Sequence, residues 1–184
     1  MIEYMKKNIW IKAARIIAAS QAGVLEEDKN AKFILHLTQW WNPEFCIEFY
    51  NFMLNHNVRI DFLGLSFFPT STMSEKNDLD YFESQIKKLS EQLEKPVIIC
   101  EYAYPSAKDF KGQFAEWNKG VKGYGLNEKG QMKWIKDFLN LCRKNKYIRG
   151  AYYWSPEWYD SGMWEAFSLF DRKGRPKKGL ESFK

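Results

Sequence analysis

The sequence predicts an α/β fold in which helices cover a parallel sheet. Short apolar runs alternate along the chain with amphipathic segments whose apolar residues recur every three or four positions. This alternation favours parallel strands joined by right-handed helical crossovers. With 184 residues, 45% of them apolar, the chain has room for one domain with a sizeable core. We therefore expect a single domain over residues 1–184, built on about four strands.

A helix, a strand and a second helix form the first part of the chain. Apolar residues over 2–16 have helical spacing, and Gly23 follows the expected end of this helix. The short apolar run 33–37 is typical of a strand buried on both faces. Asn42 then provides an N-cap, and Pro43 occupies the first position of the second helix. Its expected core face comprises Phe45, Phe49, Phe52 and Met53.

Three more strands follow, over 60–69, 95–101 and 149–154. After the polar loop "TSTMSEKN", Asp78 is expected to cap one helix, and Asn127 caps another after a long loop. A last short helix should follow Pro176. The expected core faces are Leu79, Phe82, Ile86, Leu89 and Leu93 in one helix, and Met132, Ile135, Leu139 and Cys142 in the other.

Polar and aromatic residues follow each of the four predicted strands. Ligands of parallel sheets bind at the carboxyl ends of the strands, so these residues should gather at one end of the molecule. One carboxylate among aromatic rings is typical of a sugar-binding site, because rings pack on the C–H faces of pyranoses. The residues are His36, Trp40 and Trp41; Ser66, Phe67 and Phe68; Glu101, Tyr102 and Tyr104; and Trp154, Glu157 and Trp158.

Composition argues against several other classes of protein. The net charge of +5 is spread along the chain, and its densest run, "RKGRPKK", reads as solvated surface or as a polyanion contact. No zinc-finger, RNP or basic-helix pattern supports nucleic-acid binding. Three cysteines without a CxxC pair indicate free thiols, and no spacing of His, Asp or Glu indicates a metal or cofactor. The start "MIEYMKKNIW" lacks the features of a signal peptide, and no apolar run could span a membrane.

Six segments resemble, in order, motifs of the endo-β-1,4-galactanases of glycoside hydrolase family 53. They are "FILHL", "DFLGLSFFP", "VIICEYAYP", "NEKGQMKWIKDF", "GAYYWSPEW" and "WEAFSLFDRKGRP", and the resemblance runs from about residue 11 to the end. It implies the C-terminal half of a (β/α)8 TIM barrel, with four parallel strands equivalent to the fifth to the eighth and flanking helices. The chain departs from the family where Phe67 and Phe68 replace tyrosine, and where "LTQWWN" replaces an Asp- or Gly-rich stretch.

The resemblance implies a catalytic role for Glu101, at the end of "VIICE". The corresponding glutamate is the nucleophile of a retaining glycosidase; the alternative is a structural glutamate in an ion pair. Trp154 would be the platform beneath the sugar, or else a core residue. His36 would hydrogen-bond near the site, or be a satisfied core histidine. Phe68 and Tyr104 would line the cleft, and Trp40, Trp41 and Trp158 would offer outer stacking surfaces or simply pack.

The same resemblance implies that the acid/base glutamate is missing from this chain. In the family it belongs to an Asn-Glu pair after the fourth strand, whereas Asn127-Glu128 here begins a helix. Glu157 and Glu165 are the remaining candidates for the acid. The implied substrate is β-1,4-galactan, from the type I arabinogalactan of pectin, and the implied enzyme is secreted or extracellular. We also expect self-association through the open half-barrel. The alternatives are another retaining β-glycanase of the same clan, or a non-catalytic carbohydrate-binding remnant.

Overall fold

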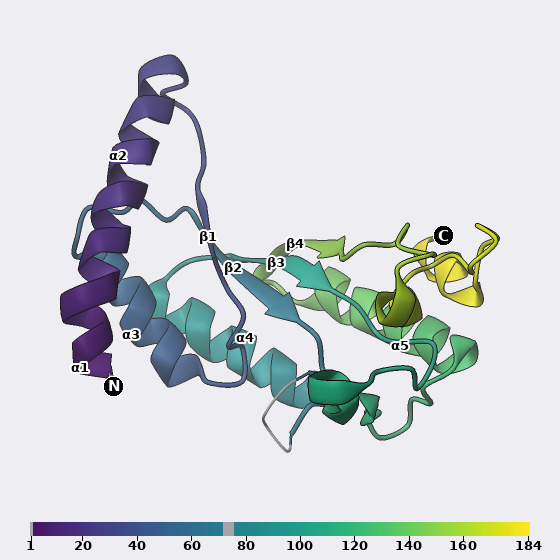
Figure 1. Ribbon diagram of the computed structural model, residues 1–184. Coiled ribbons are helices and arrows are strands. Elements are labelled where there is room, and N and C mark those ends of the chain that lie inside the picture. Colours follow the sequence, from purple (N-terminus) through teal and green to yellow (C-terminus); the bar gives the residue numbers. More distant parts are fainter. Residues whose placement is uncertain (1, 72–75) are drawn as a thin grey trace.

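The computed structural model describes residues 2–71 and 76–184, and within them it contains one sheet of four parallel strands. Residues 72–75 of the loop "TSTMSEKN" lie outside the described part. The strands lie in chain order, as the sequence predicts (Figure 1). Their bounds are β1 Ile34–Leu37, β2 Phe62–Phe67, β3 Val97–Tyr102 and β4 Ile148–Tyr153.

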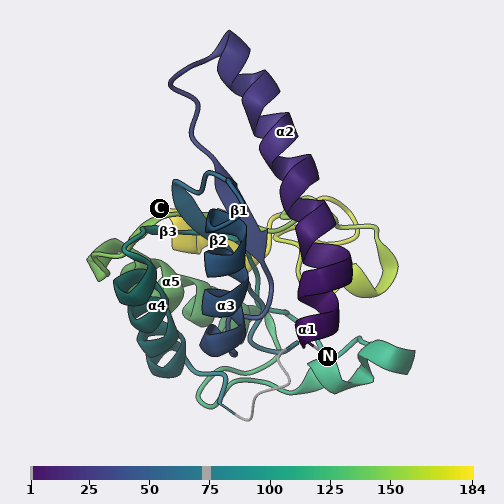
Figure 2. The same ribbon diagram turned by 90° about the vertical axis from the view of Figure 1, so that its left-hand side faces the viewer.

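Helices cover one face of this sheet. Figures 1 and 2 show α3, α4 and α5 on that face, while α2 stands beside β1 at the edge. Short helical turns occur in the long loop after β3 and after Pro176. The helices are α1 Ile2–Met5, a π-helical turn Lys6–Trp10, α2 Ile11–Glu27, α3 Pro43–Leu54, α4 Leu79–Leu93 and α5 Glu128–Lys144, with 3₁₀ turns η2 Gly112–Asn118, η3 Gly162–Ala166 and η4 Lys178–Phe183.

The three predicted N-caps are confirmed. The side chains of Asn42, Asp78 and Asn127 each accept a hydrogen bond from a backbone N–H three residues further on. The predicted end of the first helix at Gly23 is wrong, because α2 continues to Glu27. A Cβ atom at Gly23 would meet nothing within 4 Å, so this exposed glycine weakens the helix without ending it.

The core between the sheet and the helices is rich in aromatic residues. Phe67 of β2 stacks on Phe82 of α4 with ring centroids 3.8 Å apart, and Trp134 stacks on Phe138 within α5 at 5.1 Å. These large rings turn α5 so that its buried face differs from the predicted one. Of the predicted face only Ile135 is buried, and the others are half-buried: Met132, Leu139 and Cys142. The buried face is Gln131, Trp134, Ile135 and Phe138.

The predicted core face of α3 is divided between two neighbours. Three phenylalanines are half-buried around the ring of Trp10, at centroid distances of 5.7, 5.1 and 5.5 Å: Phe45, Phe49 and Phe52. Met53 is fully buried, together with Cys46 and Tyr50. The Tyr50 hydroxyl donates to the carbonyls of Leu35 and Gly64, so this second set holds α3 against the sheet.

The other face of the sheet has no helical cover among the described residues. Ile34 of β1 is 44% exposed and Tyr152 of β4 is 62% exposed. The prediction that 33–37 is buried on both faces is therefore wrong, because helices cover only one face. At the centre of the open face a Cβ on Gly64 would lie 2.7 Å from Ile34 and 2.9 Å from Cys100, so only glycine fits there.

Candidate active site

A bulge at the end of β3 turns Glu101 toward the open face of the sheet. Val97 and Ile99 are buried, as expected for residues that alternate toward the helices. Leu65 pairs with Ile99, but the next residue, Ser66, pairs with Glu101, which leaves Cys100 without a partner in β2. The extra residue breaks the alternation, and Glu101 is half-buried rather than packed under the helices. β-Bulges commonly re-aim a side chain in this way.

Glu101 belongs to a hydrogen-bonded chain that crosses three adjacent strands. The Ser66 hydroxyl donates to Glu101 Oε2 at 3.1 Å, and His36 Nε2 lies 2.7 Å from the same hydroxyl oxygen. A serine has one hydroxyl hydrogen, which goes to the carboxylate, so His36 Nε2 must carry a proton and donate to Ser66. The chain runs from exposed His36 through buried Ser66 to half-buried Glu101. It fixes one carboxylate oxygen at the carboxyl end of the sheet.

Aromatic rings gather after β2 and β4, the two strands that flank β3. Trp154 directly follows β4, and its backbone N–H donates to the carbonyl of Tyr102 at 2.9 Å. Its half-buried ring meets Phe68 edge-on at 5.5 Å and Trp158 at 4.8 Å. Trp158 is 39% exposed and Phe68 is half-buried. Trp164 packs edge-on against Trp154 and stacks on Phe167. Together with Phe68 these three rings form a continuous cluster, which we call the aromatic wall: Phe68, Trp154, Trp164 and Phe167.

Two of the predicted sugar contacts lie in the core instead. Trp40 is 1% exposed and packs against Phe67 and Phe82. Tyr104 is 0% exposed; its ring stacks on Trp134, and its hydroxyl donates to the carbonyl of Tyr124 at 2.8 Å. The expectation that Tyr104 lines the cleft is corrected, and of the two alternatives for Trp40 its burial agrees with packing. Trp41 is half-buried and meets Trp40 edge-on.

The other candidate acids do not join Glu101. Glu165 Oε2 accepts from Arg172 Nε at 2.5 Å, and Glu157 is exposed in the loop after β4. Glu128 begins α5 next to its cap, Asn127. Among residues 2–71 and 76–184, the hydrogen bond formed by the Glu101 side chain is the one from Ser66. Within the described residues, neither Glu157 nor Glu165 forms a hydrogen bond with Glu101.

Ser66 was expected at the end of a strand, but no role in the site was predicted for it. Residues two apart in a strand lie on the same face, so Ser66 shares with Gly64 the face of the sheet that points away from the helices. This spacing is the signal that could have identified Ser66 as a site residue. Two buried polar residues had no predicted role in the site: Gln131 lies in the motif "NEKGQMKWIKDF", and Lys177 lies in the run "RKGRPKK". The expectation that this run is solvated surface is wrong for Lys177, which is 8% exposed. Neither Gln131 nor Lys177 follows a strand, so only the packing of the loops brings them near the site.

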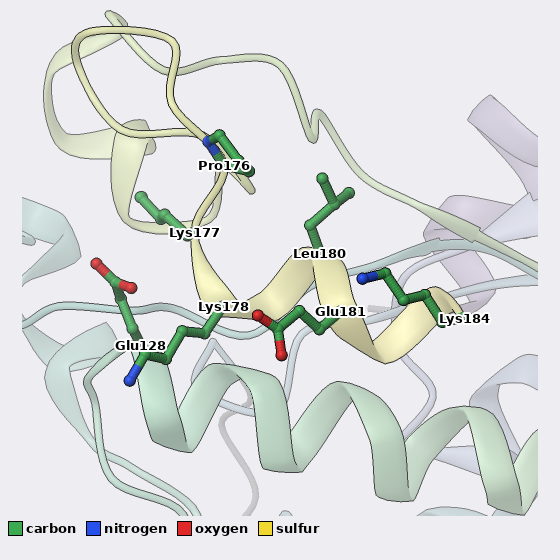
Figure 3. Close-up of a pocket in the computed structure, with 7 residues that line it drawn as sticks. All are labelled: Glu128, Pro176, Lys177, Lys178, Leu180, Glu181 and Lys184. Carbon is green, nitrogen blue, oxygen red and sulfur yellow. The ribbon is translucent and has the colours of Figure 1, made fainter.

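Other features of the described residues lie apart from this site. A pocket of about 360 Å³ lies between the start of α5 and η4. Figure 3 shows the residues that line it: Glu128, Pro176, Lys177, Lys178, Leu180, Glu181 and Lys184. None of the predicted site residues lines it. In the described ranges, no three His, Cys, Asp or Glu side chains cluster so as to hold a metal ion. None of the helices described is both long and apolar enough to cross a membrane.

Comparison with known structures places the sheet within a larger barrel. The Ignisphaera aggregans GH53 catalytic domain superposes with a TM-score of 0.80 at 24% identity, over 95% of this chain and 52% of that one. A structure from a study of two fungal β-1,4-galactanases superposes with a TM-score of 0.78 at 20% identity, over 96% and 55% of the respective chains. The four strands and their helices thus match about half of a (β/α)8 barrel, as the resemblance implied.

Sequence comparison agrees with the structural match. A Niallia circulans protein named "Uncharacterized protein in bgaB 5'region" is 26% identical over 191 residues, which cover 95% of this chain and 51% of that protein. The chain thus spans about half the length of the relatives it matches. The model of glycosyl hydrolase family 53 matches residues 1–183. This match covers nearly the whole chain, and the chain therefore belongs to glycosyl hydrolase family 53.

Proposed function

We propose that this chain forms the nucleophile-bearing half of a retaining endo-β-1,4-galactanase. The observation that carries the proposal is the bulge in β3, which turns the Glu101 carboxylate onto the open face, where it accepts a hydrogen bond from Ser66. A galactanase is favoured over other glycosidases because the chain belongs to family 53 and the fungal structure it resembles is described as a β-1,4-galactanase. We further propose that the complete enzyme acts outside the cell on β-1,4-galactan.

In this mechanism Glu101 attacks the anomeric carbon of a galactosyl unit. The new C–O bond to Glu101 forms as the glycosidic C–O bond breaks, and an acid protonates the departing oxygen. The same acid, now a base, removes a proton from the water that releases the sugar. Ser66 holds one oxygen of Glu101, so that the other is free to attack. The ring of Trp154 supports the sugar in line with that oxygen.

We propose that the acid/base carboxyl comes from outside the residues of this sequence. A retaining enzyme needs two carboxyl groups about 5 Å apart. Glu165 is committed to Arg172, and Glu157 is exposed on a loop. The open face of the sheet, with Ile34 and Tyr152 exposed, is where an additional set of strands would place it.

The nucleophile can be tested without the acid. A 2-deoxy-2-fluoro-β-galactoside with a 2,4-dinitrophenolate leaving group needs no protonation, and it stops at the glycosyl-enzyme ester. We expect this 184-residue chain to gain one fluorogalactosyl group, located on Glu101 by peptide mass spectrometry. Glu101→Gln should gain none, while Glu157→Gln and Glu165→Gln should still be labelled. Labelling of another residue, or of the Glu101→Gln variant, would refute the assignment.

A non-catalytic carbohydrate-binding role is the second candidate. It is favoured because the two candidate acids among the described residues are engaged elsewhere or exposed: Glu165 pairs with Arg172, and Glu157 lies exposed on a loop. Binding of galactotetraose without any labelling by the fluorosugar would support it. The same experiment with gluco- and manno-configured fluorosugars distinguishes a galactanase from another β-glycanase of the clan, because the preferred sugar should label fastest.

A further inference from the structure

Two loops at the carboxyl end of the sheet carry the parts of the proposed site. One follows Glu101 and continues through Tyr104 to Ser106; the other follows Trp154 and includes Phe167 of the aromatic wall. The backbones of these loops meet at one hydrogen bond, from Ser106 N to the carbonyl of Ala166 at 2.7 Å. Loop segments held by so few backbone bonds depend on side chains for their relative position.

Besides the Ser106 hydroxyl, which donates to the carbonyl of Ala166 at 3.0 Å, two buried side chains from outside the loop after β3 connect the two loops, and Gln131 is one of them. It lies at the start of α5 with 0% exposure, and its Nε2 donates to the carbonyl of Tyr104 at 2.9 Å. The carbonyls of Ala166, Phe167 and Ser168 lie 3.3, 3.5 and 3.4 Å from the same nitrogen. The amide has two hydrogens, so one serves the loop after β3 and the other serves the loop after β4.

Lys177 is the second connection, from the other side. It is 8% exposed, and its Nζ donates to the carbonyl of Glu165 at 2.7 Å and to Ser106 Oγ at 3.2 Å. In the described residues no carboxylate lies within ion-pair distance of this ammonium group. Its hydrogens are instead shared between the same two loops that Gln131 joins.

We infer that Gln131 and Lys177 are positioning residues that hold the aromatic wall at a fixed place relative to Glu101. The inference rests on the proposed role of Glu101, because that role makes the distance between wall and carboxylate matter for reaction. Neither residue contacts the reacting atoms. Removing either would let the loop with Phe167 shift against the loop after Glu101, while each loop keeps its own fold.

The test uses Gln131→Met and Lys177→Met in the full chain, with Gln85→Met as the matched control. Gln85 is 9% exposed on α4, and its amide donates to Ser84 rather than to the site loops. Inactivation by the dinitrophenyl fluorogalactoside is followed as a function of inhibitor concentration. This separates the binding constant KI from the rate constant kinact. Far-UV circular dichroism fixes the folded fraction, and near-UV circular dichroism reports on the packing of the tryptophans.

We expect kinact to fall by about tenfold or more in both site variants, with KI changed by less than about threefold. The near-UV spectrum should change in both, and Gln85→Met should match the wild type.

The inference is overturned if kinact is unchanged in folded variants, or if it falls only in proportion to the folded fraction. If one of the two site variants does not fold, the kinact of the other variant tests the inference. An unlabelled wild-type chain would refute the proposed function itself, and with it this inference, whereas a labelled wild type with unaffected variants would refute the inference alone.

Discussion

Ser66 donates its hydroxyl hydrogen to the carboxylate of Glu101 across the bulged pair of strands β2 and β3, at 3.1 Å. This bond exists because the pairing shifts by one residue just before it. The bulge therefore has two effects: it turns the Glu101 carboxylate away from the helices, and it gives that carboxylate a fixed donor.

Ser66→Ala should slow the labelling of Glu101 by the activated fluorosugar. The substitution removes a hydrogen bond to a charged group, worth about 1.5 kcal/mol or roughly tenfold in rate, because the carboxylate loses its fixed orientation. The inactivation rate constant measures this. Ser90→Ala, which removes a hydroxyl that bonds the carbonyl of Lys95 far from the site, serves as control. Equal rates in wild type and Ser66→Ala would show that the bond does not position the nucleophile.

Glu101→Gln keeps the shape of the side chain but removes the attacking charge. In a complete enzyme that contains this half, we expect turnover of galactan to fall by several orders of magnitude, with oligosaccharide binding largely kept. Reducing-sugar release and a binding titration on the same preparation separate the two effects. Residual turnover above a few per cent would exclude the nucleophile role.

Trp154→Ala should remove the sugar platform. The loss of one face of ring packing is expected to cost about 2 kcal/mol in kinact/KI for the fluorosugar. Trp154→Phe keeps a ring face and should recover part of the loss. The opposing result, an unchanged kinact/KI in Trp154→Ala, would make this tryptophan a packing residue of the aromatic wall and nothing more.

The chain by itself should release no reducing sugar from galactan and should associate with a second copy. Apolar residues are exposed at both edges of the sheet, with Ile16 and Ile34 on the β1 side and Tyr152 and Phe183 on the β4 side. A two-fold axis along the strands would place β4 of one copy beside β1 of the other and cover both sets. Size-exclusion chromatography with light scattering measures the mass.

A stable monomer at micromolar concentration would contradict the association. The activity part has its own check: the other half of a family 53 barrel, supplied as a separate chain, should restore hydrolysis. Hydrolysis by the unsupplemented chain would contradict the view that the acid/base lies elsewhere, and would direct attention to Glu157 and Glu165.

Asp61 should make stability depend on pH in the acid range. Burial opposes its ionisation, but the Phe33 N–H, Arg59 and Lys32 more than compensate and lower the pKa of Asp61 below its usual 3.8. A carboxyl whose folded-state pKa is depressed stabilises the fold above the unfolded value, and this contribution is lost as pH falls through the folded value. Asp61→Asn should lower the urea midpoint at pH 7, and the difference from wild type should shrink below about pH 4. Exposed Glu26→Gln should show little difference; a pH-independent gap for Asp61→Asn would contradict the linkage.

Much of the fold follows from local sequence. The strands are short apolar runs, and Asn42, Asp78 and Asn127 end the preceding loops with side chains that satisfy the first N–H groups of each helix. These signals act over a few residues, so they could be recognised without knowledge of the tertiary structure. The order of six motifs likewise indicated the family and the candidate nucleophile.

Tertiary structure decided the remaining features of the site, because those features depend on which residues from distant segments of the chain come into contact. Sequence alone determined that a carboxylate lies near the carboxyl end of β3 and that a tryptophan follows β4, since both are features of single strand ends. It could not show that Trp40 and Tyr104 are buried while Trp158 is exposed, because all three are aromatic residues in loops after strands. Nor could it show the bulge opposite Ser66 or the bridging of two loops by Gln131 and Lys177. Those depend on the register between strands and on the packing of loops, which long-range contacts alone determine.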